Sequence, residues 1–256
     1  MDEPEKRSRD QIGGFAKGLS VIEAFGPDRQ RLTIAEVSRL TGLERATARR
    51  YLLTLVAGGY ADYDGKFFTL TPRVLRLGYA YLSATPLPGI LQPVLEQVAE
   101  TTRESSSASI LDGTDIVYIA RAAQRRVMSI GLQVGSRLPA YCASMGRVLL
   151  AALPPEVAAE RLAASHLERL TPRTLIDIKS LTEEIAKVRE RGYAVIDEEL
   201  EIGLRSVAVP VYDAGGRVVA AMNVGVQVAR ASLDDLVHRL LPPLREAQAG
   251  LRRMIA

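Results

Sequence analysis

Two adjacent segments near the start of the chain carry apolar residues at the spacing of helices. Their apolar stripes are Ile34, Val37 and Leu40 in the first segment, and Ala48, Tyr51, Leu52 and Leu55 in the second. Thr33, with Glu36 three residues later, predicts a capping box at the start of the first segment. Gly42 suits the turn between them, because glycine takes a positive φ without steric cost. The pattern therefore predicts two short helices joined by a tight turn.

Basic residues gather on the polar face of the second predicted helix, at the end that would enter a major groove. This layout is typical of a helix-turn-helix that reads DNA. We expect DNA contacts from Arg45, Thr47, Arg49 and Arg50. An ordinary helical hairpin with a solvated arginine face is the alternative interpretation.

The elements around these two helices favour DNA binding. Residues 15–25 place Phe15, Leu19, Ile22 and Phe25 on one stripe, which predicts a third helix covering the other two. Residues 60–70 have the pattern of a β-hairpin with a turn at 63–66. Three helices followed by a hairpin form a winged helix-turn-helix, whose wing tip would hold Lys66 against phosphate or the minor groove. A solvated turn residue is the alternative for Lys66.

A further helix with a wide apolar stripe follows the hairpin. It begins after Thr71, with Pro72 at the first helical position. Its stripe consists of Val74, Leu75, Leu77, Gly78, Tyr81 and Leu82. This stripe indicates dimerisation, or else packing on the wing. Residues 84–89, which contain two prolines, break the chain. We expect a DNA-binding domain at 1–71, a linker helix and boundary at 72–88, and a second domain at 89–256.

The second domain mixes helical and strand patterns. Helices are expected at 90–102, 143–153, 155–164, 181–191 and 233–254, and strands at 106–111, 116–122, 127–134, 193–196, 206–212 and 218–228. Ser180 is the expected cap of the fourth of these helices, and Gly192 its end. Short hairpins predict a mostly antiparallel sheet with helices to one side, so the chain is expected to be an α+β protein.

Composition and charge sharpen this picture. The 256 residues are 47% hydrophobic and 25% charged, which fits a two-domain globular protein. The excess positive charge lies in residues 1–84, with 13 Lys/Arg against 10 Asp/Glu, whereas residues 85–256 hold 20 of each. The single cysteine, Cys142, excludes an intrachain disulfide and fits a reducing cytoplasm. We expect neither a membrane span nor a signal peptide.

Residue patterns typical of enzymes are missing from the sequence. His166 and His238 form no metal-ligand pair, and no glycine-rich phosphate loop occurs. Cys142 with a distant histidine could serve as nucleophile and base, but a small buried residue is the better interpretation. We therefore expect a regulatory ligand-binding domain, without metal or cofactor, rather than an enzyme.

Six segments, in their order and spacing, are similar to one known family. They are residues 15–25, 32–60 and 68–78 in the winged-helix half, and residues 138–151, 188–195 and 198–224 in the other half. The chain resembles the IclR family of bacterial transcriptional regulators. The segment LPAYCASMGRVLLA at 138–151 resembles the subgroup that controls aromatic-acid catabolism through the β-ketoadipate pathway. The resemblance implies a homodimer, often paired into a tetramer, that binds palindromic double-stranded operator DNA under the control of a small effector.

The resemblance also implies an effector pocket on the concave side of a curved antiparallel sheet. By position, its lining residues are Ser144, Met145, Gly146, Leu204, Arg205, Ser206, Asn223 and Gly225. Asn223 and Gly225 stand where better-known members carry serine, and Ile196 stands where glyoxylate-type members carry an acidic residue. These departures favour a ligand that is larger and flatter than glyoxylate. In the recognition helix, Ala46 stands where relatives often carry serine.

A carboxylate effector needs a fixed cation, and arginine can hold a carboxylate with two hydrogen bonds. We expect Arg137, at a strand-to-loop junction, to point inward and bind it, with Arg121 and Arg205 as alternatives. Tyr141 and Met145 would form walls for a ring, or else fill the core. The expected effector is 4-hydroxybenzoate, protocatechuate or β-ketoadipate. Three alternatives stay open: another small-acid pathway, an enzyme domain fused to a DNA-binding module, or a DNA-binding scaffold whose second domain only oligomerises.

Overall fold

The computed structural model describes residues 12–124 and 131–255. The chain divides into two compact units, Met1–Ala84 and Thr85–Ala256. No helix among the described residues is long and apolar enough to cross a membrane. Each unit has its own hydrophobic core and is described by itself.

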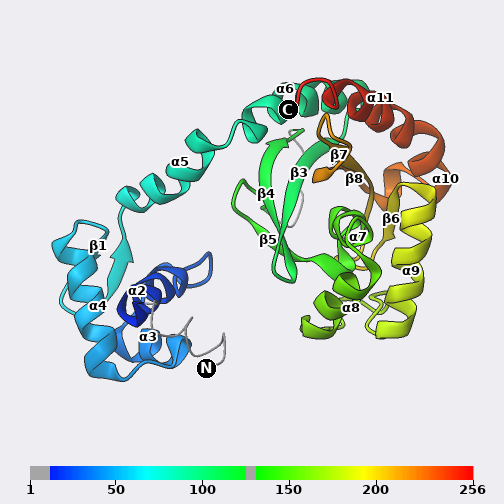
Figure 1. Cartoon of the computed structure of the whole chain (residues 1–256). Helices are drawn as coiled ribbons and strands as arrows, with labels where there is room; N and C mark the ends of the chain where they lie inside the picture. The colour runs from blue at the N-terminus through cyan, green and yellow to red at the C-terminus, as the bar shows by residue number, and fades with distance from the viewer. Residues whose placement is uncertain (1–11, 125–130, 256) are drawn as a thin grey trace, which may run out of the picture. The chain divides into compact units, whose positions relative to one another are not determined.

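The first unit is a winged helix-turn-helix (Figure 1). Its elements are α2 (Gly13–Glu23), α3 (Ile34–Thr41), α4 (Arg45–Ala57), β1 (Ala61–Tyr63) and β2 (Phe68–Leu70). The core between them contains Val21, Val37, Leu52 and Phe68, all fully buried. The hairpin is tied to the helices, because the backbone of Leu32 exchanges two hydrogen bonds with that of Phe68. The three helices and the wing are confirmed.

The local signals at the helix-turn-helix act as the sequence predicts. The Thr33 side chain accepts a hydrogen bond from the Glu36 backbone N–H, and the Glu36 carboxylate accepts one from the Thr33 N–H, which completes the capping box. Gly42 ends α3 with a φ of 69°. That value lies in the left-handed region, where a side chain would be strained.

Two short elements follow the wing: a 3₁₀ turn, η1 (Pro72–Val74), and α5 (Leu75–Ala84). Thr71 caps this segment, because its hydroxyl accepts a hydrogen bond from the Arg73 backbone N–H. No residue of α5 is buried. Its large apolar side chains Leu75, Leu77, Tyr79, Tyr81 and Leu82 are all exposed. The apolar stripe is therefore not covered by the wing.

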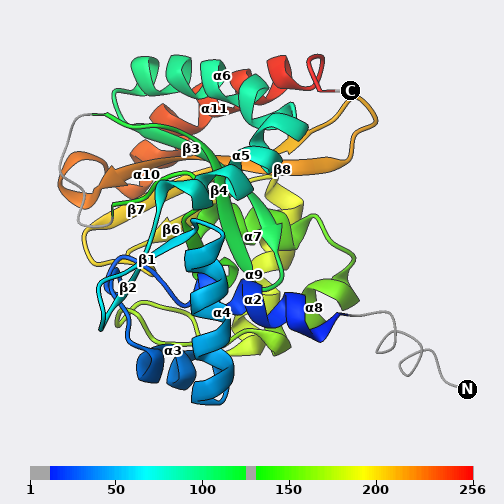
Figure 2. The same cartoon turned by 90° about the vertical axis from the view of Figure 1, so that its left-hand side faces the viewer.

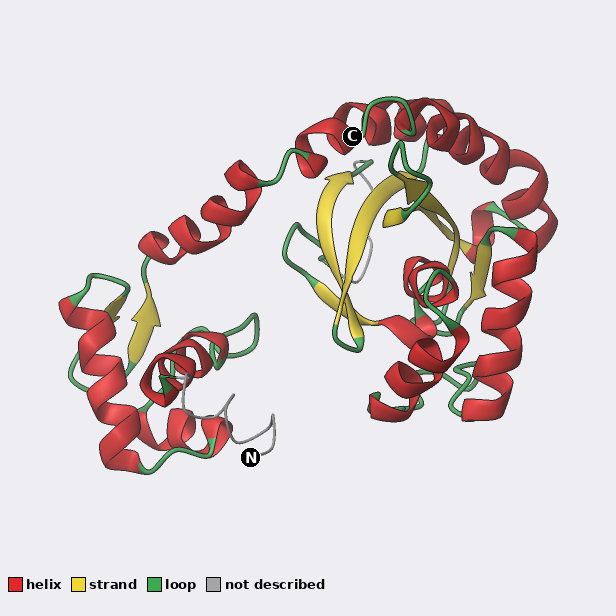
Figure 3. Ribbon diagram, viewed as in Figure 1, coloured by secondary structure: helices red, strands yellow, loops and turns green. Residues whose placement is uncertain are grey.

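The second unit is built on one curled sheet (Figure 3). Its strands are β3 (Ser105–Asp112), β4 (Asp115–Ala122), β5 (Arg137–Pro139), β6 (Ala194–Asp197), β7 (Leu204–Tyr212) and β8 (Val218–Gln227). Its helices and turns are α6 (Leu87–Thr102), η2 (Ala140–Cys142), α7 (Ser144–Ala151), α8 (Pro155–Ala164), α9 (Ile178–Arg191), η3 (Val228–Arg230), α10 (Leu233–Asp235), η4 (Leu236–Leu240) and α11 (Leu241–Leu251). The strands are ordered β5-β4-β3-β8-β7-β6, and every neighbouring pair is antiparallel.

Helices cover both faces of this sheet rather than one side. Along β7, Val207 and Val209 pack in a core with α6 and α11, whereas Ala208 between them packs in a second core with α7 and α9. Alternation of this kind follows from the two-residue period of a strand. Figure 2 shows α6 and α11 running along the same side of the sheet. The expected one-sided arrangement is wrong, because both faces of the central strands are apolar.

Three further details differ from the sequence expectations. Residues 131–134 form no strand, and 125–130 lie outside the described residues; the strand beside β4 is β5. Helix α9 begins after Asp177, whose carboxylate accepts the Ser180 backbone N–H, so Asp177 rather than Ser180 is the cap. The predicted closing helix is interrupted by a π-helical stretch at η4.

Candidate nucleic-acid interface and ligand cavity

The exposed face of α4 presents unpaired positive charge. Arg45, Arg49 and Arg50 are exposed, and none of them forms an ion pair with any residue of 12–124 or 131–255. Thr47 is half-buried, and its hydroxyl accepts a long 3.5 Å hydrogen bond from Arg50 Nη2. Guanidinium groups that lie on one helix without a carboxylate partner are suited to phosphate oxygens and guanine edges.

The wing tip carries two cations on one aromatic ring. The Asp64 carboxylate accepts the backbone N–H groups of Phe67 and Lys66, at 2.7 and 2.9 Å. These bonds lower the pKa of Asp64, which also forms an ion pair with Arg31. The Arg31 guanidinium lies 4.6 Å and the Lys66 ammonium 5.0 Å from the Phe67 ring centroid. The turn therefore fixes Lys66 at the tip, beside Arg31, which sequence reasoning did not single out.

The second unit contains a cavity between the concave face of the sheet and the first turn of α7. Its lining consists of Ser105, Ser107, Tyr118, Arg121, Leu132, Leu138, Cys142, Ala143, Ser144, Met145, Ile196, Leu200, Leu204, Ser206, Asn223 and Gly225. The cavity volume is about 30 Å³. That is space for about two water molecules. A ring-sized ligand can enter this site only if some lining side chains move.

Strand register brings the polar lining residues into two rows across the sheet. Ser107 of β3 lies opposite Arg121 of β4 on one side and opposite Asn223 of β8 on the other. Two residues along β3, Ser105 lies opposite Gly225, which pairs with Ser206 of β7. The rows face the cavity because alternate strand residues share a face.

Arg121 is the cation of the cavity. It is half-buried, its Nη1 donates to the Ser107 hydroxyl at 3.0 Å, and it forms no ion pair with any described residue. Loss of water lowers the pKa of Arg121, but arginine stays charged. A guanidinium with a hydroxyl partner and no carboxylate partner is suited to bind an anionic ligand.

The first turn of α7 supplies the other polar side of the cavity. The Ser206 hydroxyl donates to the Ser144 hydroxyl at 2.9 Å, which ties this turn to β7. Ala143 precedes the helix without a side-chain cap, so the first N–H groups of α7 have no capping side chain. The N-terminal end of a helix carries partial positive charge and favours an electronegative group.

The structure does not bring Arg137 to the cavity. Arg137 lies on the edge strand β5, where its side chain is 48% exposed and forms ion pairs with Asp112 and Asp115. The reason is register: Arg137 lies opposite Val117 of β4, on the strand face that Val117 shares with Asp115, and Asp112 lies opposite Asp115 at the β3–β4 turn. The expectation that its guanidinium points inward is corrected accordingly.

Two more expected lining residues lie outside the cavity, as does Tyr141. Arg205 faces away, because it lies between the lining residues Leu204 and Ser206, and it forms an ion pair with Asp197. Gly146 is a packing residue, since a Cβ there would lie 2.2 Å from the Ala140 carbonyl oxygen. The Tyr141 hydroxyl donates to the Glu168 carbonyl instead of facing the cavity.

The remaining expected residues do line the cavity: Ser144, Met145, Leu204, Ser206, Asn223 and Gly225. Sequence reasoning missed Ser105, Ser107 and Tyr118. A signal for the serines existed, because residues 105–107 and 109 are all serine within one strand. Small hydroxyl side chains on a buried strand indicate a polar site rather than a solvated face.

The single cysteine, Cys142, is not suited to act as a nucleophile. Cys142 lines the cavity, and burial raises the pKa of its thiol to about 12. The thiol is therefore protonated at neutral pH and a poor nucleophile. Within the described ranges, no group of three or more His, Cys, Asp or Glu side chains could hold a metal ion.

Curated relatives match nearly the whole chain. The "Pca regulon regulatory protein" of Pseudomonas putida is 47% identical over 94% of this chain and 84% of its own length. The "p-hydroxybenzoate hydroxylase transcriptional activator" of Acinetobacter baylyi is 41% identical over 98% of this chain and 94% of its own length.

A solved structure of a ligand-binding domain matches about two thirds of the chain. It is the inducer-binding domain of the PobR transcription factor from Acinetobacter, a double mutant in complex with 3-hydroxybenzoic acid. It is 35% identical, covers 66% of this chain and 98% of its own chain, and superimposes with a TM-score of 0.63.

Family models cover both units. The model "Bacterial transcriptional regulator IclR C-terminal" matches residues 79–252, which is more than half of the chain. The model "IclR helix-turn-helix domain" matches residues 15–65. With a winged helix-turn-helix in one unit and a small cavity lined by polar and apolar residues in the other, this chain belongs to the IclR family of bacterial transcriptional regulators.

Proposed function

We propose that this regulator controls genes of aromatic-acid catabolism, and that its effector is a small aromatic or dicarboxylic acid whose carboxylate binds Arg121. The observation that carries the proposal is the half-buried Arg121 guanidinium, which faces the cavity and has no carboxylate partner among the described residues. Arg121 thus replaces Arg137 in this role, because Asp112 and Asp115 already neutralise Arg137.

The rest of the lining suits the other parts of such an acid. Leu138, Leu200 and Met145 supply apolar contact for a ring or chain. Ser144 and Ser206, together with the first N–H groups of α7, supply hydrogen bonds for a hydroxyl or second carboxylate. Two named relatives support this class, since one controls a pca regulon and the other p-hydroxybenzoate hydroxylase. The complex of the PobR domain with 3-hydroxybenzoic acid supports it as well.

The small size of the cavity supports a link between binding and conformation. A cavity of about 30 Å³ must widen before it can hold a ring. An effector therefore binds one arrangement of the lining better than another, and differential affinity of this kind shifts an equilibrium between two states. Coupling free energies in such systems are typically about 1–3 kcal/mol.

The change between the two states alters how tightly the protein binds operator DNA. Residues 1–71 bind it, with Arg45, Thr47, Arg49 and Arg50 in the major groove and Lys66 at the wing, while residues 89–256 receive the effector. The linker region, residues 72–88, carries the exposed apolar side chains of α5, which favour a homodimer or a dimer of dimers. The regulator acts in the cytoplasm, whose reducing conditions suit a chain with a single cysteine. Such a dimer reads a palindrome with half-sites about one helical turn, or a multiple of one, apart.

A ligand panel tests the effector class. The melting temperature of the protein is measured with 4-hydroxybenzoate, protocatechuate and β-ketoadipate, each at saturating concentration. A true effector at about 100 times its dissociation constant stabilises the folded state by about 2.7 kcal/mol. No shift with any of the three contradicts the proposed class and favours either another acid or a second unit that only oligomerises.

A further inference from the structure

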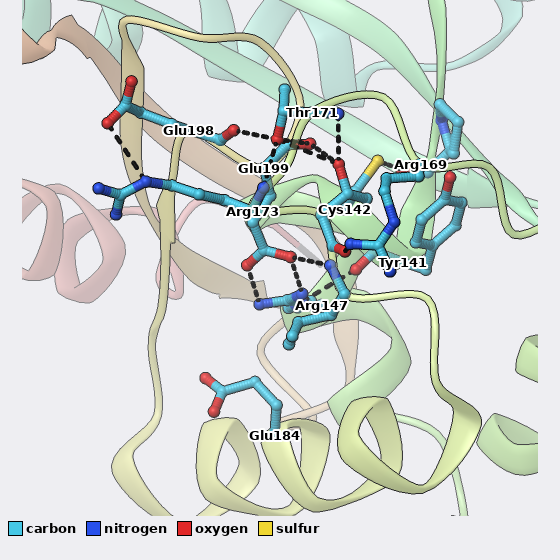
Figure 4. A network of polar contacts seen from close by, with 12 residues as sticks. Tyr141, Cys142, Arg147, Arg169, Thr171, Arg173, Glu184, Glu198 and Glu199 are labelled. Carbon is cyan, nitrogen blue, oxygen red and sulfur yellow. Dashed lines mark hydrogen bonds and ion pairs between the residues drawn. The ribbon is translucent and has the colours of Figure 1, made fainter.

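A buried ion pair joins Arg147 to Glu199 (Figure 4). Arg147 is 2% exposed and Glu199 is 7% exposed. Arg147 donates from Nη1 to Glu199 Oε1 at 2.8 Å and from Nη2 to Oε2 at 2.6 Å. Its Nε donates to the Tyr141 carbonyl oxygen at 2.9 Å. Arg147 is thus held in one direction by three hydrogen bonds.

Stability alone does not account for this pair. Removing two charges from water costs several kcal/mol per ion, and apolar residues of similar volume often replace such pairs without loss. Helix α7, which carries Arg147, packs with α8 and α9 in one hydrophobic core. Apolar substitutes would lack hydrogen bonds of fixed direction. The role of the pair therefore depends on the two segments that its hydrogen bonds connect.

The pair ties α7 to the loop between β6 and β7, residues 198–203. Glu199 is fixed from a third segment, because the Leu175 backbone N–H donates to Glu199 Oε2 at 3.0 Å and the Thr174 hydroxyl donates to the Glu199 carbonyl at 2.6 Å. The Thr171 hydroxyl donates to the neighbouring Glu198 carbonyl at 2.7 Å. Figure 4 shows these bonds converging on the loop around Glu199.

Both segments that the pair joins line the effector cavity. Ser144 and Met145 come from the first turn of α7, and Leu200 comes from the loop directly after Glu199. Neither Arg147 nor Glu199 lines the cavity. The pair therefore has no reach to a ligand and can act on it only through the residues that it positions.

The first turn of α7 is rigidly attached on its other sides. Gly146 allows the backbone of η2 to pack directly on the helix at Ala140. The bond between Ser144 and Ser206 fixes the same turn to β7. A displacement of this turn by a ligand is therefore transmitted to whatever Arg147 holds.

We propose that Arg147 and Glu199 are positioning residues that make α7 and the 198–203 loop one body, so that both cavity walls move together when the effector binds. The proposal rests on the proposed function, because it concerns the response of the same cavity. Its consequence lies outside the cavity: Ile202, which is 70% exposed at the tip of the loop, changes position with effector occupancy.

The test replaces the pair with apolar residues in the full-length protein, as Arg147→Met together with Glu199→Leu. This double variant is expected to fold, because apolar substitutes for a buried pair are tolerated. If it does not fold, Glu199→Gln replaces it, since the amide keeps the shape of the side chain. The matched control is Arg191→Met with Glu184→Leu, which removes a 2.8 Å ion pair of α9 whose residues do not line the cavity.

Hydrogen exchange without ligand gives the first readout. In the variant, amides of the loop such as that of Gly203, which donates to the unchanged Glu198, are expected to exchange at least about tenfold faster than in the parent, while amides of α7 stay unchanged. In the control variant, the loop amides should exchange at the same rate as in the parent. Loop exchange within twofold of the parent in the apolar or the Gln variant overturns the proposal.

The second readout is the effector's influence on operator binding. The ratio of operator affinities with and without effector is expected to fall toward one in the variant, although calorimetry still detects effector binding. A ratio equal to that of the parent overturns the proposal. If the proposed function is wrong, the parent protein itself shows no effector binding. The hydrogen-exchange experiment needs no effector, so it still decides whether the pair joins the two walls.

Discussion

On the β4 side of the cavity, Arg121 is half-buried with a serine hydroxyl as its side-chain partner, whereas on the α7 side Arg147 is buried against Glu199. Both guanidinium groups lie in the same unit and near the same cavity. The unpaired one faces the cavity and can bind a new anion, while the paired one is turned away and holds the wall. The side-chain partner of each arginine thus indicates its role: an arginine without a carboxylate partner can bind a ligand, whereas an arginine paired with a carboxylate holds other parts of the protein in position.

The largest expected effect comes from a substitution of Arg147. Arg147→Met alone leaves Glu199 as a buried charge without its partner, so we expect a loss of about 3–5 kcal/mol in the free energy of unfolding. Denaturant unfolding followed by circular dichroism measures this loss. The reference is Arg137→Met, which removes exposed ion pairs and should cost no more than about 1 kcal/mol. Equal effects of the two variants would contradict the structural role assigned to Arg147.

Arg121→Met should affect effector binding rather than the free energy of unfolding. We expect little change in stability, because no described carboxylate loses its partner, but a loss of about 1.5–3 kcal/mol in effector binding, the strength of a charged hydrogen bond. That corresponds to a dissociation constant raised roughly tenfold to 150-fold. Calorimetric titration of the effector measures it. A large loss of stability with unchanged affinity would reverse the comparison.

The arginines of α4 extend the comparison to the other unit, where they are unpaired and exposed. Arg49→Ala should weaken specific operator binding by about 1–3 kcal/mol if the residue reads a base. Lys66→Ala should instead weaken all sequences alike and reduce the salt slope by about one, as expected for a phosphate contact. Gel-shift titrations at several salt concentrations separate these outcomes. Unchanged affinity for Arg49→Ala would remove this residue from the reading set.

Cys142 provides the smallest and most local probe. Since the pKa of its thiol is raised to about 12, the thiolate fraction is small at neutral pH and grows about tenfold per pH unit up to that value. The reaction with a thiol-specific disulfide reagent should accelerate accordingly between pH 7 and pH 10, and effector should slow it. A rate that levels off near pH 8.5 would show an exposed, ordinary thiol.

The DNA-binding unit was predictable because its signals are local. Thr33 and Gly42 determine the ends of α3 through bonds and dihedral angles within a few residues. The repeated apolar spacing then leaves one exposed face for the arginines of α4. Neither step requires knowledge of distant contacts.

The cavity was harder to predict because a strand residue faces whichever side its register gives it. The sequence indicated Arg137 as inward-facing, but β5 pairs with β4 so that Arg137 lies opposite Val117 and its guanidinium reaches Asp115, two residues earlier on β4. The β-bulge between Ala108 and Ser109 further shifts the pairing of β3 with β4, where Ser107 meets Arg121. The ion pair between Arg147 and Glu199 joins residues 52 positions apart, so no local pattern reveals it.

The most direct test of the account is a cycle that pairs a change in the protein with a change in the ligand. Calorimetry measures 4-hydroxybenzoate and its neutral amide, 4-hydroxybenzamide, on the parent and on Arg121→Met. If the carboxylate binds Arg121, the parent prefers the acid and the variant loses that preference, with a coupling free energy of about 1.5–3 kcal/mol. An acid preference that is the same in both proteins would contradict the account, because the cation of the cavity would then be another group.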